Sequence, residues 1–98
     1  MRKFLCMHTL PPGAITPEQA CQIAEAAQHD PNVRGYRSFL NLTEGKVCCV
    51  LEAADREAIA AWFDKMGIAY DYIVPVEFEA DRGAMEDLRE QAAVAGLA

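Results

Sequence analysis

Hydrophobic residues recur along this chain in patterns that predict four strands. Residues 2–9 (RKFLCMHT) are apolar on both faces, which is typical of a strand at the centre of a sheet. Residues 33–42 and 46–53 predict a second and a third strand, and residues 69–80 predict a fourth. Pro75 lies within the fourth strand and cannot donate a backbone hydrogen bond, so this strand is expected at a sheet edge or beside a bulge.

A first helix is predicted to begin directly after Thr16. Thr16 suits the N-cap, Pro17 suits the first helical position, and Gln19 completes a capping box. Four apolar residues recur at helical spacing and form one face: Ala20, Ile23, Ala24 and Ala27. The alanines are small, so this helix is expected to pack closely on a sheet. Asp30 and Pro31 end it.

Two later segments also have a helical pattern. Asp55 can cap a second helix, and Gly67 is a suitable stop after its last turn. Its apolar face is Ile59, Trp62, Phe63 and Met66. Residues 85–96 contain helix-forming residues with an apolar row at Met85, Leu88 and Ala92. This last segment is expected to be either a short third helix packed on a neighbour or a fraying tail.

The predicted order of elements is β-α-β-β-α-β followed by a helix, which is the ferredoxin-like arrangement of an α+β protein. We expect an antiparallel sheet with helices on one face, residues 1–80 as the domain and residues 81–98 as a C-terminal helical extension. Gly45 is expected to adopt positive φ in the turn between the second and third strands. We also expect the first and third strands to be parallel neighbours at the centre, which would place His8 and Glu52 side by side.

Composition and charge narrow the range of partners. The chain has 98 residues, of which 52% are hydrophobic, which is more apolar surface than one small core hides. A homodimer is therefore expected. The net charge is −6 and there is no run of Lys or Arg, which argues against nucleic acid as a partner.

The cysteines bear on the cellular compartment. They occupy positions 6, 21, 48 and 49, and the short apolar run before His8 does not form a signal peptide. No stretch is long enough to span a membrane. We therefore expect a cytoplasmic protein with reduced thiols rather than a disulfide framework.

His8 is the leading candidate for chemistry. It lies two residues after Cys6, so the two side chains share one face of the first strand, and Glu52 is expected to reach them from the third. Imidazole, thiolate and carboxylate together form a donor set that a transition metal accepts. No C-x-x-C or H-x-x-x-H spacing accompanies them, and a buried histidine with a structural hydrogen bond is the alternative interpretation. Cys49 is expected on the face opposite Cys48 and Glu52, where it acts most simply as a small hydrophobic residue.

The second strand contains Tyr36 and Arg37, which allow another interpretation. Tyr36 could supply a hydroxyl, and Arg37 or Arg34 could bind an anionic ligand. The alternative is a solvated strand whose arginines pair with the acidic surface. There is no Ser-His-Asp grouping and no glycine-rich phosphate loop, so nucleotide binding is not expected.

Three segments carry a family resemblance: MRKFLCMHTLPPGAITPEQ, VRGYRSFLNLTEGKVCCVLEAADREAIAAWFDKMG and IVPVE. They resemble a small bacterial family typified by nickel-responsive, nickel-binding proteins, over about residues 2–79. The shared positions are His8, the run from Gly45 to Ala53 that includes Cys49 and Glu52, and the acidic helix start. The resemblance implies a ferredoxin-like homodimer with a nickel site at or near His8, Cys49 and Glu52. Where a nickel-binding member has a further histidine in the second strand, this chain has Arg37.

Three functional interpretations follow. The first is a small metal-binding protein that prefers nickel and acts in metal handling or response, with His8, Cys49 and Glu52 as ligands. The second is a dimeric αβ-barrel enzyme or ligand-binding protein for a small organic molecule, anionic ones included, with a site at His8, Tyr36, Arg37 and Glu52. The third is a structural or regulatory dimer without a ligand. Position 37 separates the first two, since an arginine there favours an anionic organic ligand over a metal.

Overall fold

A computed structural model of the chain describes residues 1–94. The strands are β1 (Arg2–Thr9), β2 (Val33–Asn41), β3 (Lys46–Ala53), β4 (Tyr72–Pro75), β5 (Phe78–Asp81) and β6 (Ala84–Asp87). The helices are α1 (Pro17–Gln28), α2 (Arg56–Met66) and α3 (Arg89–Val94).

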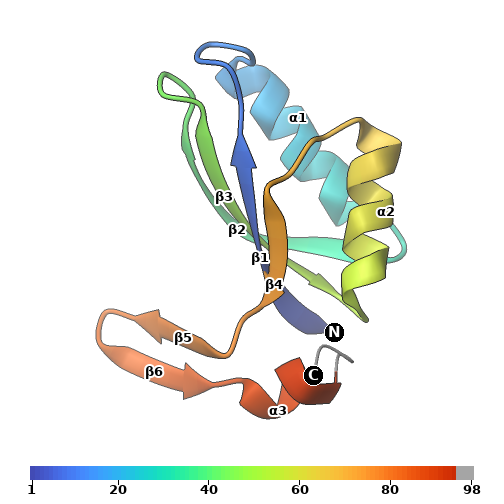
Figure 1. The fold of residues 1–98 in the computed structure, drawn as a ribbon, viewed down its shortest axis with the longest axis vertical. Coiled ribbons are helices and arrows are strands. Elements are labelled where there is room, and N and C mark those ends of the chain that lie inside the picture. Colours follow the sequence, from blue (N-terminus) through green and yellow to red (C-terminus); the bar gives the residue numbers. More distant parts are fainter. Residues whose placement is uncertain (95–98) are drawn as a thin grey trace.

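Four strands form one antiparallel sheet in the order β2-β3-β1-β4, and β5 and β6 form a separate two-stranded sheet. Helices α1 and α2 lie on the same side of the four-stranded sheet (Figure 1). This is the ferredoxin-like fold, as predicted. The first strand is central, and β4, which contains Pro75, lies at an edge where its missing N–H costs no ladder bond.

The predicted parallel pairing of the first and third strands is wrong, because β1 and β3 are antiparallel neighbours. The crossover through α1 makes β1 parallel to β2, and the tight hairpin then reverses β3 relative to both. His8 therefore pairs with Val47 at one end of β3, whereas Glu52 pairs with Lys3 at the other end. The expected neighbourhood of His8 and Glu52 does not form.

The hydrophobic core lies between the helices and one face of the sheet, here called the inner face. Phe4 and Cys6 of β1 and Leu51 of β3 point to this face and are buried. Helix α2 covers them with three buried side chains: Ile59, Trp62 and Phe63. Helix α1 contributes one buried residue, Ala27, so the two helices share the core very unequally.

The capping residues act as the sequence predicts. The Thr16 hydroxyl accepts a hydrogen bond from the Gln19 N–H, and the Gln19 side chain accepts from the Thr16 N–H. Asp55 caps α2 by accepting from Ala58 N–H, and Gly67 ends it in the left-handed region with φ 69°. None of the helices in residues 1–94 is long and apolar enough to cross a membrane.

The C-terminal segment differs from the predicted helix. Residues 84–87 form strand β6, because Arg82 and Gly83, both at positive φ, make a tight two-residue turn that pairs it with β5. Met85 is consequently 68% exposed. Leu88, just before the short α3, and Ala92, within it, are both buried. The rest of the predicted helix, residues 95–96, lies outside the described residues.

Candidate functional site

His8 is buried near the end of β1, with its side chain on the inner face. Only 2% of its surface is exposed. Its Nδ1 lies 2.8 Å from the carbonyl oxygen of Ala69, in the segment between α2 and β4. A carbonyl oxygen only accepts, so in the neutral imidazole Nδ1 carries the proton and Nε2 keeps a lone pair. The ring also meets the Phe63 ring edge to face, with centroids 4.9 Å apart.

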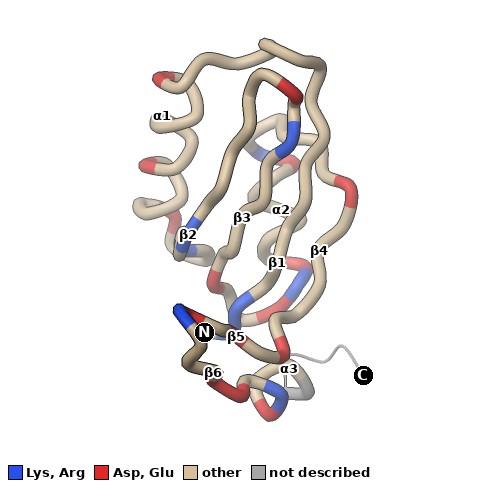
Figure 2. The backbone as a smooth tube through the Cα atoms, turned by 90° about the vertical axis from the view of Figure 1, so that its left-hand side faces the viewer, with Lys and Arg blue, Asp and Glu red and all other residues tan. Residues whose placement is uncertain are grey.

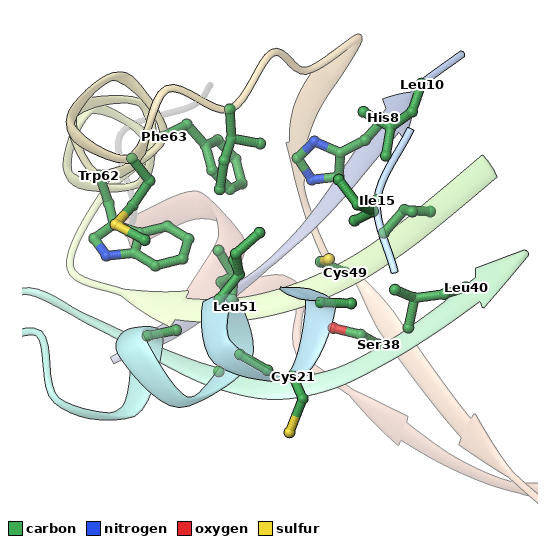
Figure 3. Close-up of a pocket in the computed structure, with 18 of the residues that line it drawn as sticks. His8, Leu10, Ile15, Cys21, Ser38, Leu40, Cys49, Leu51, Trp62 and Phe63 are labelled. Atoms are coloured by element: carbon green, nitrogen blue, oxygen red, sulfur yellow. The ribbon is translucent and has the colours of Figure 1, made fainter. Parts of the chain in front are cut away.

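The imidazole borders a cavity of about 960 Å³ between α1, the inner face of β2 and β3, and the end of α2. Figure 3 shows His8 and Cys49 directed into this pocket, with Leu10, Ile15 and Leu40 around it. Much of its wall is formed by branched aliphatic side chains: Leu10, Ile15, Ile23, Leu40, Leu42, Val47, Leu51 and Ile68. Within residues 1–94, no other group hydrogen-bonds the imidazole, so Nε2 is free to meet a ligand.

The pocket exists because α1 touches the sheet mainly through its C-terminal end. There, Gln28 Nε2 donates to the Gly35 carbonyl at 3.1 Å, and the Ala27 side chain packs beside Gly35. Towards the N-terminus of the helix, Ala20 is only partly buried and Ala24 is exposed. The small apolar residues that predicted close packing therefore leave space over the sheet instead.

Of the cysteines, Cys49 is the one on the sheet that reaches the pocket. Burial raises the pKa of its thiol, an effect that a hydrogen bond from the neighbouring Ser38 partly offsets. Cys6 lies directly opposite Cys49 in β1 but is fully buried, and burial first, then Cys49, raise its pKa to about 12. Cys48 points to the other face of the sheet, and the Cys21 sulfur on α1 points away from His8 (Figure 3).

Glu52 is separated from this site by position and by face. It lies at the far end of β3 and points to the outer face of the sheet, which the helices do not cover. Its cross-strand neighbours are Lys3 and Arg34. A single chain therefore does not bring Glu52 together with His8 and Cys49.

Tyr36 and Arg37 are also directed elsewhere, although both contribute to the pocket wall. Tyr36 is the extra residue of a bulge between Gly35 and Arg37, and its hydroxyl donates to Glu79 of β5. The ammonium of Lys3 lies 3.9 Å from the Tyr36 ring centroid, and the Arg37 guanidinium carbon lies 5.8 Å from it. The predicted organic-ligand set of His8, Tyr36, Arg37 and Glu52 is thus not brought together.

Two neighbours of the site, Ser38 and the Ala69 carbonyl, are not among the residues predicted from the sequence. Ser38 could have been found, because the turn pairs Asn41 with Lys46, and counting back along both strands places Ser38 opposite Cys49. The Ala69 carbonyl could not, since its approach to His8 depends on how α2 packs. Among residues 1–94, no three His, Cys, Asp or Glu side chains gather closely enough to hold a metal ion by themselves.

Comparison with known proteins agrees with this fold. The family model described as "Nickel responsive protein SCO4226-like" matches residues 4–76. The crystal structure of SCO4226 from Streptomyces coelicolor A3(2) is similar, with a TM-score of 0.66 and 27% identity over 80% of this chain and 99% of that one. No curated protein matches the chain. The matched region covers all four strands of the main sheet and both helices on it, so this chain belongs to the SCO4226-like family of nickel-responsive proteins.

Proposed function

We propose that this protein binds Ni²⁺ as part of a response to nickel, and that His8 and Cys49 are the donors from each chain. The observation that supports this most is the lone pair of His8 Nε2, which is held towards a pocket that also contains the Cys49 thiol. The bond from Nδ1–H to the Ala69 carbonyl orients the ring in the way that metal-binding histidines are usually oriented.

The donor chemistry suits nickel, and the number of donors limits the mode of binding. Imidazole is a common nickel ligand, and a thiolate adds a soft donor. Two protein donors leave further coordination positions, which water or a second copy of the chain would fill. Ni²⁺ is here the cargo of the protein, and its binding would release the Cys49 proton. The four cysteines are free in the structure, which suits a reducing compartment such as the cytoplasm.

We also propose that the protein acts as a homodimer through the outer face of the sheet. Seven apolar or thiol side chains point to this face: Leu5, Met7, Phe39, Cys48, Val50, Tyr72 and Val74. Phe39 is 63% exposed and Tyr72 45%. The middle stretches of β1, β3 and β4 carry no Lys, Arg, Asp or Glu, as Figure 2 makes visible. A second copy presents the same uncharged stretches, so the two sheets can stack there around a twofold axis.

Nickel titration of reduced, chelator-stripped protein tests the metal proposal. Calorimetry should find saturable binding, and a charge-transfer absorption band should report the bond between nickel and the thiolate. Cys49→Ser should abolish the band and weaken binding roughly tenfold or more, because it removes a direct donor. Cys48→Ser is the matched control, since the neighbouring thiol points to the opposite face.

His8→Ala and His29→Ala form a second matched pair, because His29 lies at the exposed end of α1. Only His8→Ala should lose binding. The His8 substitution also removes the bond to Ala69, so circular dichroism must show that the variant is folded. Saturable nickel binding that survives in both Cys49→Ser and His8→Ala would contradict the proposed donors, and a lack of binding by the wild type would contradict the function.

A further inference from the structure

We propose that the pocket beside α1 binds a neutral organic molecule that has an apolar body and one hydrogen-bond donor, such as a hydroxyl, directed at Nε2 of His8. This proposal goes beyond the nickel response and does not depend on it. Both would use the same lone pair, so such a molecule and Ni²⁺ would exclude each other at His8.

The size and lining of the cavity suit a small, mostly apolar molecule. A volume of about 960 Å³ lies within the range of small-molecule sites, which are mostly apolar with a few polar groups. Leu10, Ile15 and Leu40 surround the pocket, and Ala20 and Ala24 of α1 form its roof without filling it. Because these apolar groups remain partly exposed, an apolar molecule placed between them would remove that surface from water.

The Nε2 acceptor of His8 is accessible from the pocket. The residue as a whole is only 2% exposed, and only its Nδ1 has a hydrogen-bond partner among residues 1–94. The fully buried side-chain nitrogens without a partner in these residues belong to Arg2 and Arg56 and do not include Nε2, so this atom keeps accessible surface at the pocket wall. A ligand that donates a hydrogen bond to Nε2 would take the place of water there.

The charges around the pocket favour a neutral ligand. Among the described residues, Arg37 is the only charged one in the pocket wall, and its guanidinium group lies over the Tyr36 ring instead. The Tyr36 hydroxyl donates to Glu79, and the Gln28 amide donates to the Gly35 carbonyl. Within the described residues, no cation is therefore directed into the pocket to receive a carboxylate or a phosphate.

A matched pair of fluorescent compounds tests the proposal, with the metal removed by a chelator. 2-Naphthol carries a hydroxyl donor, and 2-methoxynaphthalene has the same rings but no donor. Fluorescence titration of the wild-type protein should give saturable binding of both, with 2-naphthol bound roughly three- to tenfold more tightly, as expected for one hydrogen bond.

Two variants locate the binding. His8→Phe keeps an aromatic ring beside Phe63 but removes the acceptor, so the preference for 2-naphthol should disappear. Ala24→Phe fills the roof of the pocket and should weaken both compounds, whereas Ala61→Phe on the exposed side of α2 should weaken neither. Should His8→Phe fail to fold, the two alanine variants still test the location.

The proposal is overturned if the wild type binds neither compound saturably, binds both equally, or loses no affinity on Ala24→Phe. None of these results bears on nickel, because the titration contains no metal. Conversely, a protein that binds 2-naphthol as described but not Ni²⁺ would refute the proposed nickel function alone.

Discussion

The two nitrogens of His8 have separate roles. Nδ1 donates to the Ala69 carbonyl and thereby fixes the ring, which leaves Nε2 as an acceptor in an apolar pocket. Sequence alternation places His8 on the same strand face as Cys6, and the structure confirms this. Alternation alone could not reveal that Cys6 is fully buried in the core, whereas Cys49 on the neighbouring strand borders the pocket. That difference depends on which residues α2 covers.

The loss of stability on substitution of Gly45 can be predicted from its backbone conformation and its surroundings. It adopts φ +76° in the turn between β2 and β3, and a Cβ there would lie 1.9 Å from the Leu10 carbonyl oxygen. Its own carbonyl accepts from Leu10 N–H at 2.8 Å. Gly45→Ala should therefore lower the free energy of unfolding by roughly 2–4 kcal/mol, from backbone strain and a backbone clash. Urea denaturation measures the change.

Gly13→Ala is the control for this substitution. Gly13 has a similar φ of +72°, but a Cβ there would meet nothing within 4 Å. Gly13→Ala should therefore lower the free energy of unfolding by about 1 kcal/mol, because only the left-handed conformation is unfavourable for alanine. Equal losses in the two variants would show that the approach of Leu10 is unimportant.

At the scale of elements, the structure confirms the two helices that capping residues predict, and it confirms the C-terminal helix in part. Helix α3 forms, whereas residues 84–87 form strand β6. Thr16, Gln19, Asp55 and Gly67 act locally, so their capping roles could be predicted from spacing alone. Residues 84–87 carry a short pattern that suits either a helix or a strand. Pairing with β5 decided between them, and that pairing depends on the turn at Arg82 and Gly83.

The β5–β6 hairpin projects from the main sheet (Figure 1), and two-stranded hairpins are marginal by themselves. Glu79 ties it to the sheet by accepting from Lys3 at 2.6 Å and from the Tyr36 hydroxyl. Glu79→Gln should speed amide hydrogen exchange in residues 78–87 by roughly fivefold, the equivalent of about 1 kcal/mol. Glu86→Gln changes the residue opposite Glu79 on the exposed β6 and should leave the exchange rate unchanged. Unchanged exchange in Glu79→Gln would exclude this anchor.

The same contact makes the hairpin sensitive to acid. The hydrogen bond from Lys3, followed by that from Tyr36, lowers the pKa of the Glu79 carboxyl below its ordinary value. Its contribution is therefore complete above the ordinary glutamate pKa and is lost as the pH falls through the lowered value. Hairpin protection, corrected for intrinsic exchange, should decrease over this range in the wild type. A Glu79→Gln variant with the same acid response would show that another group is responsible.

At the scale of the whole molecule, the large apolar content predicted more exposed hydrophobic surface than one chain hides. Within residues 1–94, neither α1 nor α2 covers the outer face of the sheet. Phe39 is the most exposed large hydrophobic residue on this face. A homodimer through this face accounts for that surface. The extension after residue 76 lies beyond the family match, so the hairpin and α3 are additions to the shared fold.

Phe39→Asp tests the dimer. A charge on the proposed interface would have to be buried beside its own symmetry copy, so the variant should be monomeric by light scattering at concentrations where the wild type is dimeric. Phe78→Asp places the same change on β5, outside the proposed interface, and should leave the dimer intact. A monomeric wild type, or a dimer that persists in Phe39→Asp, would contradict this assembly.

The sequence by itself determined the local features: the first three strands of the main sheet, the caps of α1 and α2, the shared face of Cys6 and His8, and the family. These depend on spacing, on alternation and on the conformational preferences of single residues, which act over a few positions. The predicted fourth strand, residues 69–80, divides into β4 of the main sheet and β5 of the separate hairpin. Only the tertiary structure decided which side chains meet. The antiparallel pairing of β1 and β3 separated Glu52 from His8, and the packing of α2 brought the Ala69 carbonyl to Nδ1. The contact of α1 with the sheet mainly at its C-terminal end left the pocket open. Each depends on contacts between residues far apart in the chain, which no local pattern encodes.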